Sequence, residues 1–152
     1  MKKYFLLLTL LCLSLSARAH DAEVDGIFYN LDADNKTATV TFQGDNYDSY
    51  NNEYSGDVVI PETVTYKGIT YSVTSLGDDC FSGCSSLQIV NLAEYDKLEK
   101  IGNGAFYDCD NLKEITFPKS ITTLGEEFFS GCKKVETVDL SECTKLEVIG
   151  NN

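Results

Sequence analysis

Apolar residues recur in the second half of the chain with a long period, and three segments fall into register: residues 73–97, 98–120 and 121–145. Their sequences are VTSLGDDCFSGCSSLQIVNLAEYDK, LEKIGNGAFYDCDNLKEITFPKS and ITTLGEEFFSGCKKVETVDLSECTK, and a partial copy, LEVIGNN, occupies residues 146–152. Leu-Gly or Ile-Gly pairs, phenylalanines and cysteines recur at matching positions in steps of 25 and 23 residues. Self-similarity at such a period indicates a stacked repeat architecture.

Each copy has two halves with different hydrophobic periods. In the second half of the middle copy, Ile115 and Phe117 alternate with polar residues, which predicts a short strand with one buried face. In the first half, acidic or amide residues follow a glycine and precede the aromatic residue, which predicts a short helical or 3-10 turn. One copy cannot bury its own apolar side, but stacked copies can. We therefore expect an α/β-type solenoid of parallel short strands and helical turns. One internal file would hold the phenylalanines of the three copies, Phe81, Phe106 and Phe129.

A known repeat pattern fits these copies. The pattern L-x-x-I-G-x-x-A-F-x-x-C-x-x-L-x-x-I-x-L-P is matched most closely by residues 98–118, and through it residues 73–152 resemble the BspA-type leucine-rich repeats of bacterial surface and secreted proteins. The resemblance implies a leucine-rich repeat fold. It also implies adhesion, because BspA-like proteins are associated with attachment to host matrix proteins. Cys80 and Phe128 depart from the pattern, since they stand where it has the small Ala105.

The chain before the repeats divides into two parts. Residues 1–19, MKKYFLLLTLLCLSLSARA, combine two lysines, a short apolar run and a small-x-small ending, which predicts a secretory signal peptide and not a membrane anchor. We therefore expect an exported protein (secreted, periplasmic or at the cell surface) with no membrane insertion after cleavage. Residues 20–72 contain alternating runs around the turn-forming DADNK and a tight turn at Lys67-Gly68, which predicts hairpins and an N-terminal β cap over the first repeat.

Three tyrosines lie among polar residues between the expected hairpins. The stretch GDNYDSYNNEYSG, residues 44–56, combines rigid aromatic side chains with Asp, Asn, Ser and Glu. Such a composition is typical of recognition loops. Tyr47, Tyr50 and Tyr54 are therefore a candidate contact surface, for a protein or a glycan, although the same stretch also fits a simple connection between strands.

The charge of the chain limits the classes of partner. The formal net charge is −12, and removal of Lys2, Lys3 and Arg18 with the leader makes it about −15. Such a surface repels phosphate backbones and anionic lipids, so we expect no nucleic-acid partner.

The sequence offers little catalytic chemistry. The only histidine, His20, would be the first residue after cleavage, a position that is usually disordered, so we expect no His-activated nucleophile of the usual kind, no enzyme activity and no cofactor. Five cysteines remain after the leader, and three of them (Cys84, Cys109 and Cys132) occupy one repeat position. We interpret these as small buried hydrophobic residues, with a disulfide within the column or between Cys80 and Cys84 as the alternative. A metal site is not expected, because repeat positions run along a line and do not converge on a point.

The remaining candidate site is the outer surface of the repeat strands. Residues between the buried positions should point outward and form a ladder, which solenoids use for binding: Ile89, Asn91, Ala93, Glu114, Thr116, Pro118, Thr137, Asp139 and Ser141. The leading hypothesis is a secreted or cell-surface protein that binds another protein, and the family resemblance points to a host extracellular matrix protein. The alternatives are a structural fragment of a longer repeat protein that associates end to end, and a glycan-binding module.

Overall fold

The computed structural model describes residues 20–44, 46, 54–55 and 58–151, and the predicted signal peptide, residues 1–19, lies outside the described residues. Its secondary structure consists of strands: β1 (Ala22–Val24), β2 (Ile27–Asp32), β3 (Thr37–Thr41), β4 (Thr63–Tyr66), β5 (Ile69–Leu76), β6 (Ile89–Asn91), β7 (Lys100–Ile101), β8 (Glu114–Thr116), β9 (Thr123–Leu124) and β10 (Val148–Ile149). In this part of the chain, no helix is long and apolar enough to cross a membrane.

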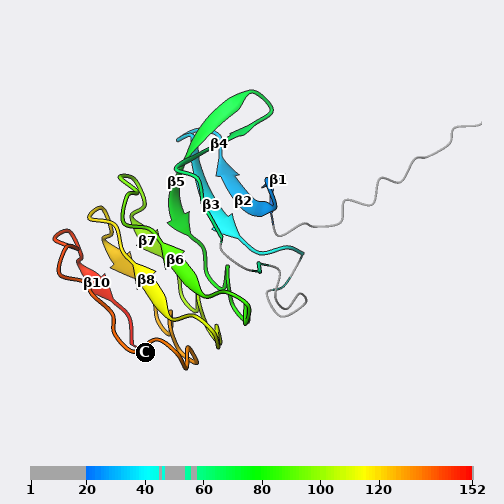
Figure 1. Ribbon diagram of the computed structural model, residues 1–152. Coiled ribbons are helices and arrows are strands. Elements are labelled where there is room, and N and C mark those ends of the chain that lie inside the picture. Colours follow the sequence, from blue (N-terminus) through cyan, green and yellow to red (C-terminus); the bar gives the residue numbers. More distant parts are fainter. Residues whose placement is uncertain (1–19, 45, 47–53, 56–57, 152) are drawn as a thin grey trace, which may run out of the picture.

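Most strands form one continuous sheet in the order β1-β2-β3-β5-β7-β9-β10, with β4 paired to β5. The N-terminal hairpins are antiparallel, whereas β5, β7, β9 and β10 are parallel and follow one another from coil to coil (Figure 1). β6 and β8 form a separate parallel pair. β5 spans the expected junction between residues 72 and 73, so the N-terminal region and the repeats share one sheet.

The N-terminal hairpins have the turns expected from the sequence. The Asp32 carboxylate accepts hydrogen bonds from the backbone N–H groups of Asp34 and Asn35 at 3.0 Å each, which fixes the turn between β2 and β3. Lys67 and Gly68 both have positive φ (49° and 81°), the conformation of a two-residue hairpin turn. These turns place the hairpins beside β5, where a cap over the first coil was expected.

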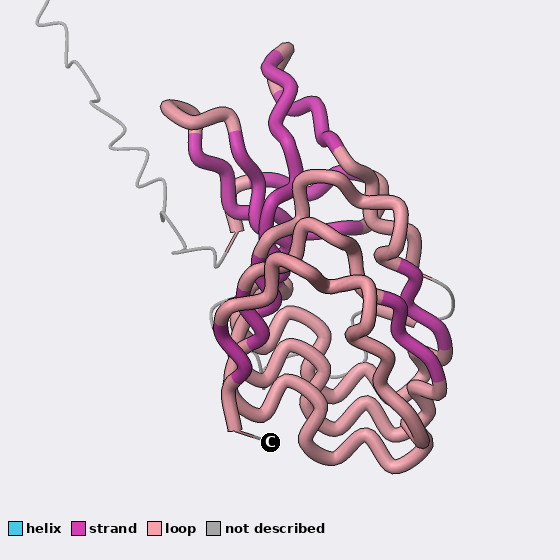
Figure 2. Tube along the Cα trace, turned by 90° about the vertical axis from the view of Figure 1, so that its left-hand side faces the viewer, coloured by secondary structure: helices cyan, strands magenta, loops and turns pink. Residues whose placement is uncertain are grey.

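The first half of each repeat differs from the expected helical turn. Asp79, Gly104 and Glu127, at one repeat position, have φ of 55°, 56° and 52°, and a left-handed residue interrupts a right-handed helix. Backbone N–H groups here donate to the next coil, as from Phe81 to Ala105 O (2.9 Å). The segment therefore forms successive turns that hydrogen-bond between coils. In Figure 2 these turns form the lower, loop-coloured side of the solenoid, between the two sides that carry strands. We call this side the turn wall.

The phenylalanine file is confirmed. The Phe81 and Phe106 rings are stacked with centroids 5.3 Å apart, and Phe106 and Phe129 follow at 5.9 Å. Phe81 and Phe106 are fully buried, whereas Phe129 is only partly buried because the last coil is less covered. The coils thus share one core.

The glycine ladder marks the closest approach of one coil to the next. A Cβ atom on Gly125 would lie 2.4 Å from the backbone carbon of Gly102, and one on Gly102 would lie 2.6 Å from that of Gly77. Real Cβ contacts of this length do not occur. The repeated Leu-Gly or Ile-Gly pair is therefore required by the spacing between coils.

Candidate functional site

The outer surface of β6 and β8 carries the predicted ladder. In this parallel pair Ile89 lies beside Glu114, and Asn91 lies beside Thr116. Ile89, Asn91 and Glu114 are exposed and Thr116 is half-buried, while Val90 between them is buried. The alternation expected for these two strands is present, so their outward side chains form a common surface, which we call the β6–β8 face.

Hydrogen bonds between side chains order the polar part of this face. The Thr116 hydroxyl donates to Asn91 Oδ1 at 2.6 Å and accepts from the Leu92 N–H at 3.1 Å. Asn91 Oδ1 also accepts from the Ala93 N–H at 3.1 Å. Ala93 is exposed but lies beyond the end of β6. The Asn91 and Thr116 side chains are therefore held in position before any partner arrives.

Pro118 is not part of the surface, and its prediction as an outward residue is wrong. β8 ends at Thr116, so the alternation between faces stops before Pro118, which is buried. Its carbonyl accepts a hydrogen bond from the Ile121 N–H at 3.2 Å, and the Cys143 thiol of the next coil lies 3.8 Å from it. A turn covered by the next coil thus replaces the end of the expected strand.

The third copy contributes exposed residues but no strand. Thr137, Asp139 and Ser141 are exposed, and the Asp139 carboxylate accepts the Ser141 N–H at 2.9 Å, which lowers the pKa of Asp139. Residues 135–140 are not assigned to a strand, so the β6–β8 pair does not extend to this copy. The ordered ladder is therefore limited to the first two copies.

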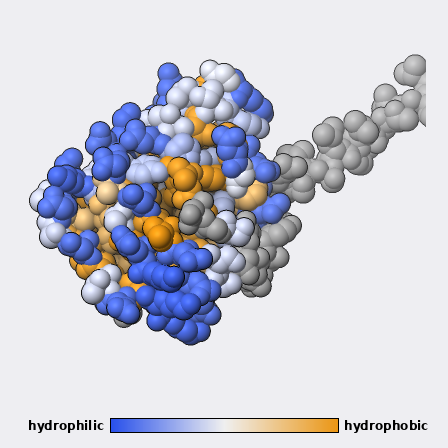
Figure 3. All heavy atoms as spheres, in the orientation of Figure 1, coloured by the Kyte–Doolittle hydropathy of each residue, from blue (hydrophilic) through white to orange (hydrophobic). Residues whose placement is uncertain are grey.

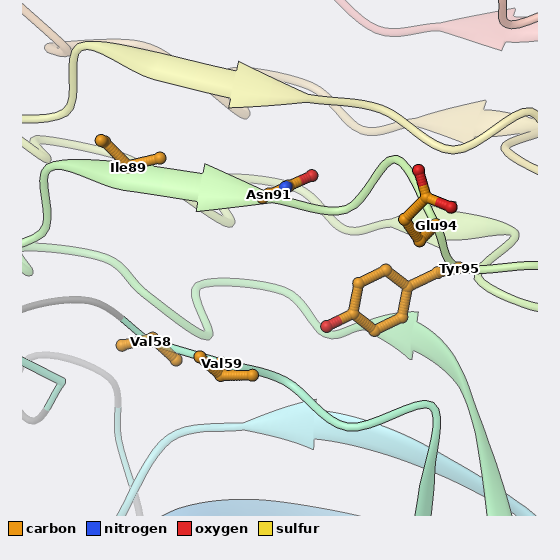
Figure 4. Close-up of a pocket in the computed structure, with 6 residues that line it drawn as sticks. All are labelled: Val58, Val59, Ile89, Asn91, Glu94 and Tyr95. Carbon is orange, nitrogen blue, oxygen red and sulfur yellow. The ribbon is translucent and has the colours of Figure 1, made fainter.

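A hollow of about 390 Å³ opens beside β6. It is lined by Val58, Val59, Ile89, Asn91, Glu94 and Tyr95. Figure 4 shows Val58 and Val59 on a segment that runs alongside β6, and the Tyr95 ring lies between this segment and β6. Figure 3 shows hydrophobic side chains gathered near the middle of the face that carries β6 and β8, with hydrophilic side chains around much of them.

Four lining residues of this hollow escaped the sequence analysis: Val58, Val59, Glu94 and Tyr95. Val58 and Val59 lie in the N-terminal region, for which the sequence predicted only hairpins, and Glu94 and Tyr95 lie in the loop after the first repeat strand. The Tyr95 hydroxyl donates to the Ile60 carbonyl, 35 residues away in the chain. No local pattern signals this contact, because it joins the N-terminal region to the first coil.

Tyr54 is a core residue and not a surface contact, so its prediction as a recognition residue is wrong. Its side chain is 3 % exposed, and its ring lies 4.8 Å from Phe81 and 5.9 Å from Phe28. Its hydroxyl donates to Thr41 O at 2.6 Å and accepts the Phe28 N–H at 3.1 Å. Tyr54 therefore extends the phenylalanine file into the N-terminal strands. The other candidates of this loop, Tyr47 and Tyr50, lie outside the described residues.

No disulfide joins the cysteines of the described chain, and most of them are buried. The Cys109 thiol donates to Phe81 O at 3.1 Å, and the Cys132 thiol to Phe106 O at 2.9 Å, each bridging to the preceding coil. The side-chain hydrogen bond with Cys132, together with burial, raises the pKa of Cys109, and burial raises that of Cys80. The raised pKa values of Cys80 and Cys109 make these two thiols poor nucleophiles, whereas the hydrogen bond with Cys109 lowers the pKa of Cys132.

Acidic residues gather around a second hollow on the turn wall. This hollow, of about 460 Å³, is lined by Asp79, Asn103, Gly104, Tyr107, Glu126 and Glu127. Burial and the neighbouring Asp78 raise the pKa of Asp79. Among the described residues, no three His, Cys, Asp or Glu side chains are placed to hold a metal ion.

Comparison with known proteins identifies the repeat type. Residues 61–152 match the family described as the BspA type leucine rich repeat region (6 copies). The match begins twelve residues before the first copy that we assigned from the sequence, within the N-terminal region. No curated protein matches the chain significantly.

Two solved structures of bacterial proteins have a similar fold. A leucine rich cell surface protein from Faecalibacterium prausnitzii is 25% identical with a TM-score of 0.61, over 82% of this chain and 35% of that protein. A leucine-rich repeat protein from Bacteroides capillosus is 24% identical with a TM-score of 0.57, over 86% of this chain and 98% of that protein. The present chain thus spans about a third of the length of the first protein and nearly all of the second.

Proposed function

Because this chain belongs to the BspA-type leucine-rich repeat family, we propose that it is a non-catalytic protein that binds another protein through the β6–β8 face. The observation that supports this most directly is the combination of an ordered polar ladder with an open apolar hollow on one side of the solenoid. Protein interfaces pair apolar pockets with a polar rim in this way. The repeat architecture supplies a rigid surface on which such residues keep their positions.

We further propose that the protein acts outside the cytoplasm. The leader-like residues 1–19 support export, and a solved relative of the same fold is a cell surface protein. A protein of the host extracellular matrix is the partner that the family association favours. Mass spectrometry of the protein purified from its own cells tests export, because cleavage after Ala19 leaves His20 as the first residue. An intact N-terminus at Met1 would contradict it.

The test of binding uses the mature chain as bait with soluble extracellular-matrix proteins. We expect Glu114→Arg, which reverses a charge on the β6–β8 face, to weaken capture about tenfold, equivalent to about 1.4 kcal/mol. Glu126→Arg is the matched control, because it makes the same charge change at an exposed position on the turn wall. Equal loss with both variants would indicate a general charge effect. No capture by the unchanged protein would remove matrix binding.

A second candidate function is assembly with further repeat units. β10 is the last strand of the sheet in the described chain, and Val148 and Ile149 are 51% and 56% exposed. An exposed apolar edge strand favours edge-to-edge pairing. Light scattering at increasing concentration tests self-association, which Val148→Lys should reduce. A concentration-independent monomer mass would exclude association between copies.

The glycan-binding alternative loses one of its three tyrosines. Tyr54 is buried in the core, so it cannot present its ring to a sugar. We therefore place protein binding first.

A further inference from the structure

One edge of β6, which we call the open edge, has no strand partner in the described part of the chain. β6 pairs with β8 on one side and with no other described strand on its second side. The Leu92 N–H donates to Thr116 O at 3.1 Å, and Gln88 O accepts from the Lys113 N–H at 2.9 Å. In a strand, the backbone N–H and C=O groups of successive residues point to opposite edges. Since Gln88 and Leu92 bond toward β8, the N–H and C=O groups of Ile89 and Asn91 point to the edge away from β8. These groups face the side on which Val58 and Val59 lie.

The open edge adjoins the apolar hollow. Val59 is 79% exposed and Ile89 is 49% exposed, so both present apolar surface to solvent. The Tyr95 hydroxyl bonds to the Ile60 carbonyl and ties the Val58–Val59 segment to the first coil. The hollow is therefore bounded by the Val58–Val59 segment on one side and by β6 on the other. β6 offers the backbone N–H and C=O groups of its open edge.

Carboxylates outnumber amines at this hollow and at the smaller hollow that adjoins it. Glu94 is among its lining residues, and Glu62 and Asp96 lie with Lys97 around a smaller hollow that shares Tyr95. The whole chain carries a net charge of −12. A cationic side chain is therefore the charged group that best complements these carboxylates.

We propose that an extended, basic segment of a partner protein adds to the open edge of β6 as a strand. It places an apolar side chain between Val59 and Ile89 and a lysine or arginine beside Glu94. Main-chain hydrogen bonds to Ile89 and Asn91 supply affinity, and the hollow and the carboxylates supply selectivity, as in other cases of strand addition. This inference rests on the proposed function and defines the chemistry of its partner.

The first experiment uses a capped heptapeptide in which valine alternates with lysine and threonine. We expect titration to shift the amide NMR signals of Ile89 and Asn91 and to leave that of Val148 on β10 unchanged. The same peptide with glutamate in place of lysine should bind about tenfold more weakly. No shift at Ile89 and Asn91, or equal affinity of the two peptides, would overturn the proposal.

Backbone methylation of the peptide tests strand addition itself. Every second N–H of an added strand points to β6, so methylation of one alternate set of peptide nitrogens should abolish binding, and methylation of the other set should not. A ligand held only by side chains has no such dependence. Equal effects of the two methylated sets would overturn the proposal.

Variants separate this inference from the broader function. Val59→Lys should weaken peptide binding about tenfold without affecting the fold, because Val59 is exposed, and Val148→Lys is the matched control. If a captured protein is sensitive to Glu114→Arg but not to Val59→Lys, strand addition is overturned and protein binding by the β6–β8 face stands. If the peptide binds as expected but no matrix protein is captured, matrix attachment is overturned and strand addition stands.

Discussion

At the scale of single residues, Tyr54 joins the N-terminal strands to the first coil. Its ring contacts Phe28 on one side and Phe81 on the other. Its hydroxyl satisfies the Phe28 N–H and the Thr41 carbonyl, both of which lie in the N-terminal sheet. The N-terminal strands therefore have a specific aromatic link to the repeats.

We predict that Tyr54→Phe lowers the free energy of unfolding by about 1–3 kcal/mol, because it removes the hydrogen-bond partner of buried backbone groups. Tyr107→Phe is the control, since Tyr107 is 37% exposed, and it should change stability by less than about 0.5 kcal/mol. Urea unfolding monitored by circular dichroism measures both. A stability of Tyr54→Phe equal to that of the unchanged protein would show that these hydrogen bonds contribute nothing.

The buried thiols predict a loss of stability at alkaline pH. Burial raises the pKa of Cys80 well above its ordinary value near 9. Above pH 9 the unfolded chain therefore loses a proton that the folded chain keeps, so the free energy of unfolding falls by about 1.4 kcal/mol per pH unit for this group.

Cys80→Ala removes this contribution, and alanine is the residue that the middle copy has at the same position. We expect the difference in stability between the two proteins to be constant from pH 6 to pH 8 and to shift in favour of Cys80→Ala above pH 9. Urea unfolding in the presence of a reductant measures it. A difference that does not change with pH would mean that the Cys80 thiol ionises equally in both states.

At the scale of the repeat element, the glycine ladder sets the distance between coils. Gly77, Gly102, Gly125 and Gly150 each lie against backbone atoms of a preceding strand or coil. Backbone cannot move aside as a flexible side chain can. The ladder is thus a steric requirement of stacking.

We predict that Gly125→Ala destabilises the protein by about 3 kcal/mol or more, because its Cβ would overlap the backbone of Gly102. Gly26→Ala is the comparison, since no atom lies within 4 Å of its Cβ and only its positive φ of 77° is strained. That variant should lose about 1–2 kcal/mol. Thermal unfolding measures the stability of the two variants. Equal losses in the free energy of unfolding would contradict the steric explanation.

At the scale of the whole molecule, burial decreases along the stack. Leu76, Ile101 and Leu124 are fully buried at successive strand positions, but Val148 and Ile149 are exposed. The β6–β8 pair likewise ends before the third copy. In a repeat protein, stability depends on contacts between neighbouring coils, so the less covered coil is the least stable part.

We expect amide hydrogen exchange to be slowest in β5 and β7 and about 10 to 100 times faster in β10, because the latter opens without breaking the rest of the core. Exchange followed by mass spectrometry of peptides from each coil measures the gradient. Uniform protection from β5 to β10 would show that the coils open only together.

Much of the architecture followed from local pattern. The steps of 25 and 23 residues predicted stacked coils, and the alternation around Val90 and Ile115 predicted which side chains lie inside. The conformation of the turns was harder to predict, because the left-handed backbone of Asp79 and Glu127 depends on hydrogen bonds to the next coil. A single copy, considered alone, fits a helical turn equally well.

The sequence by itself thus determined the repeat, its shared core and the outward positions of the first two strands, because each depends on the period of the chain. Only the tertiary structure decided that Tyr54 and Pro118 are buried and that Val58 and Val59 face β6. Each of these contacts joins residues more than twenty positions apart, between coils or between the N-terminal region and a coil. Packing between segments that are distant in the chain determines these contacts, and the local period of the sequence does not predict them.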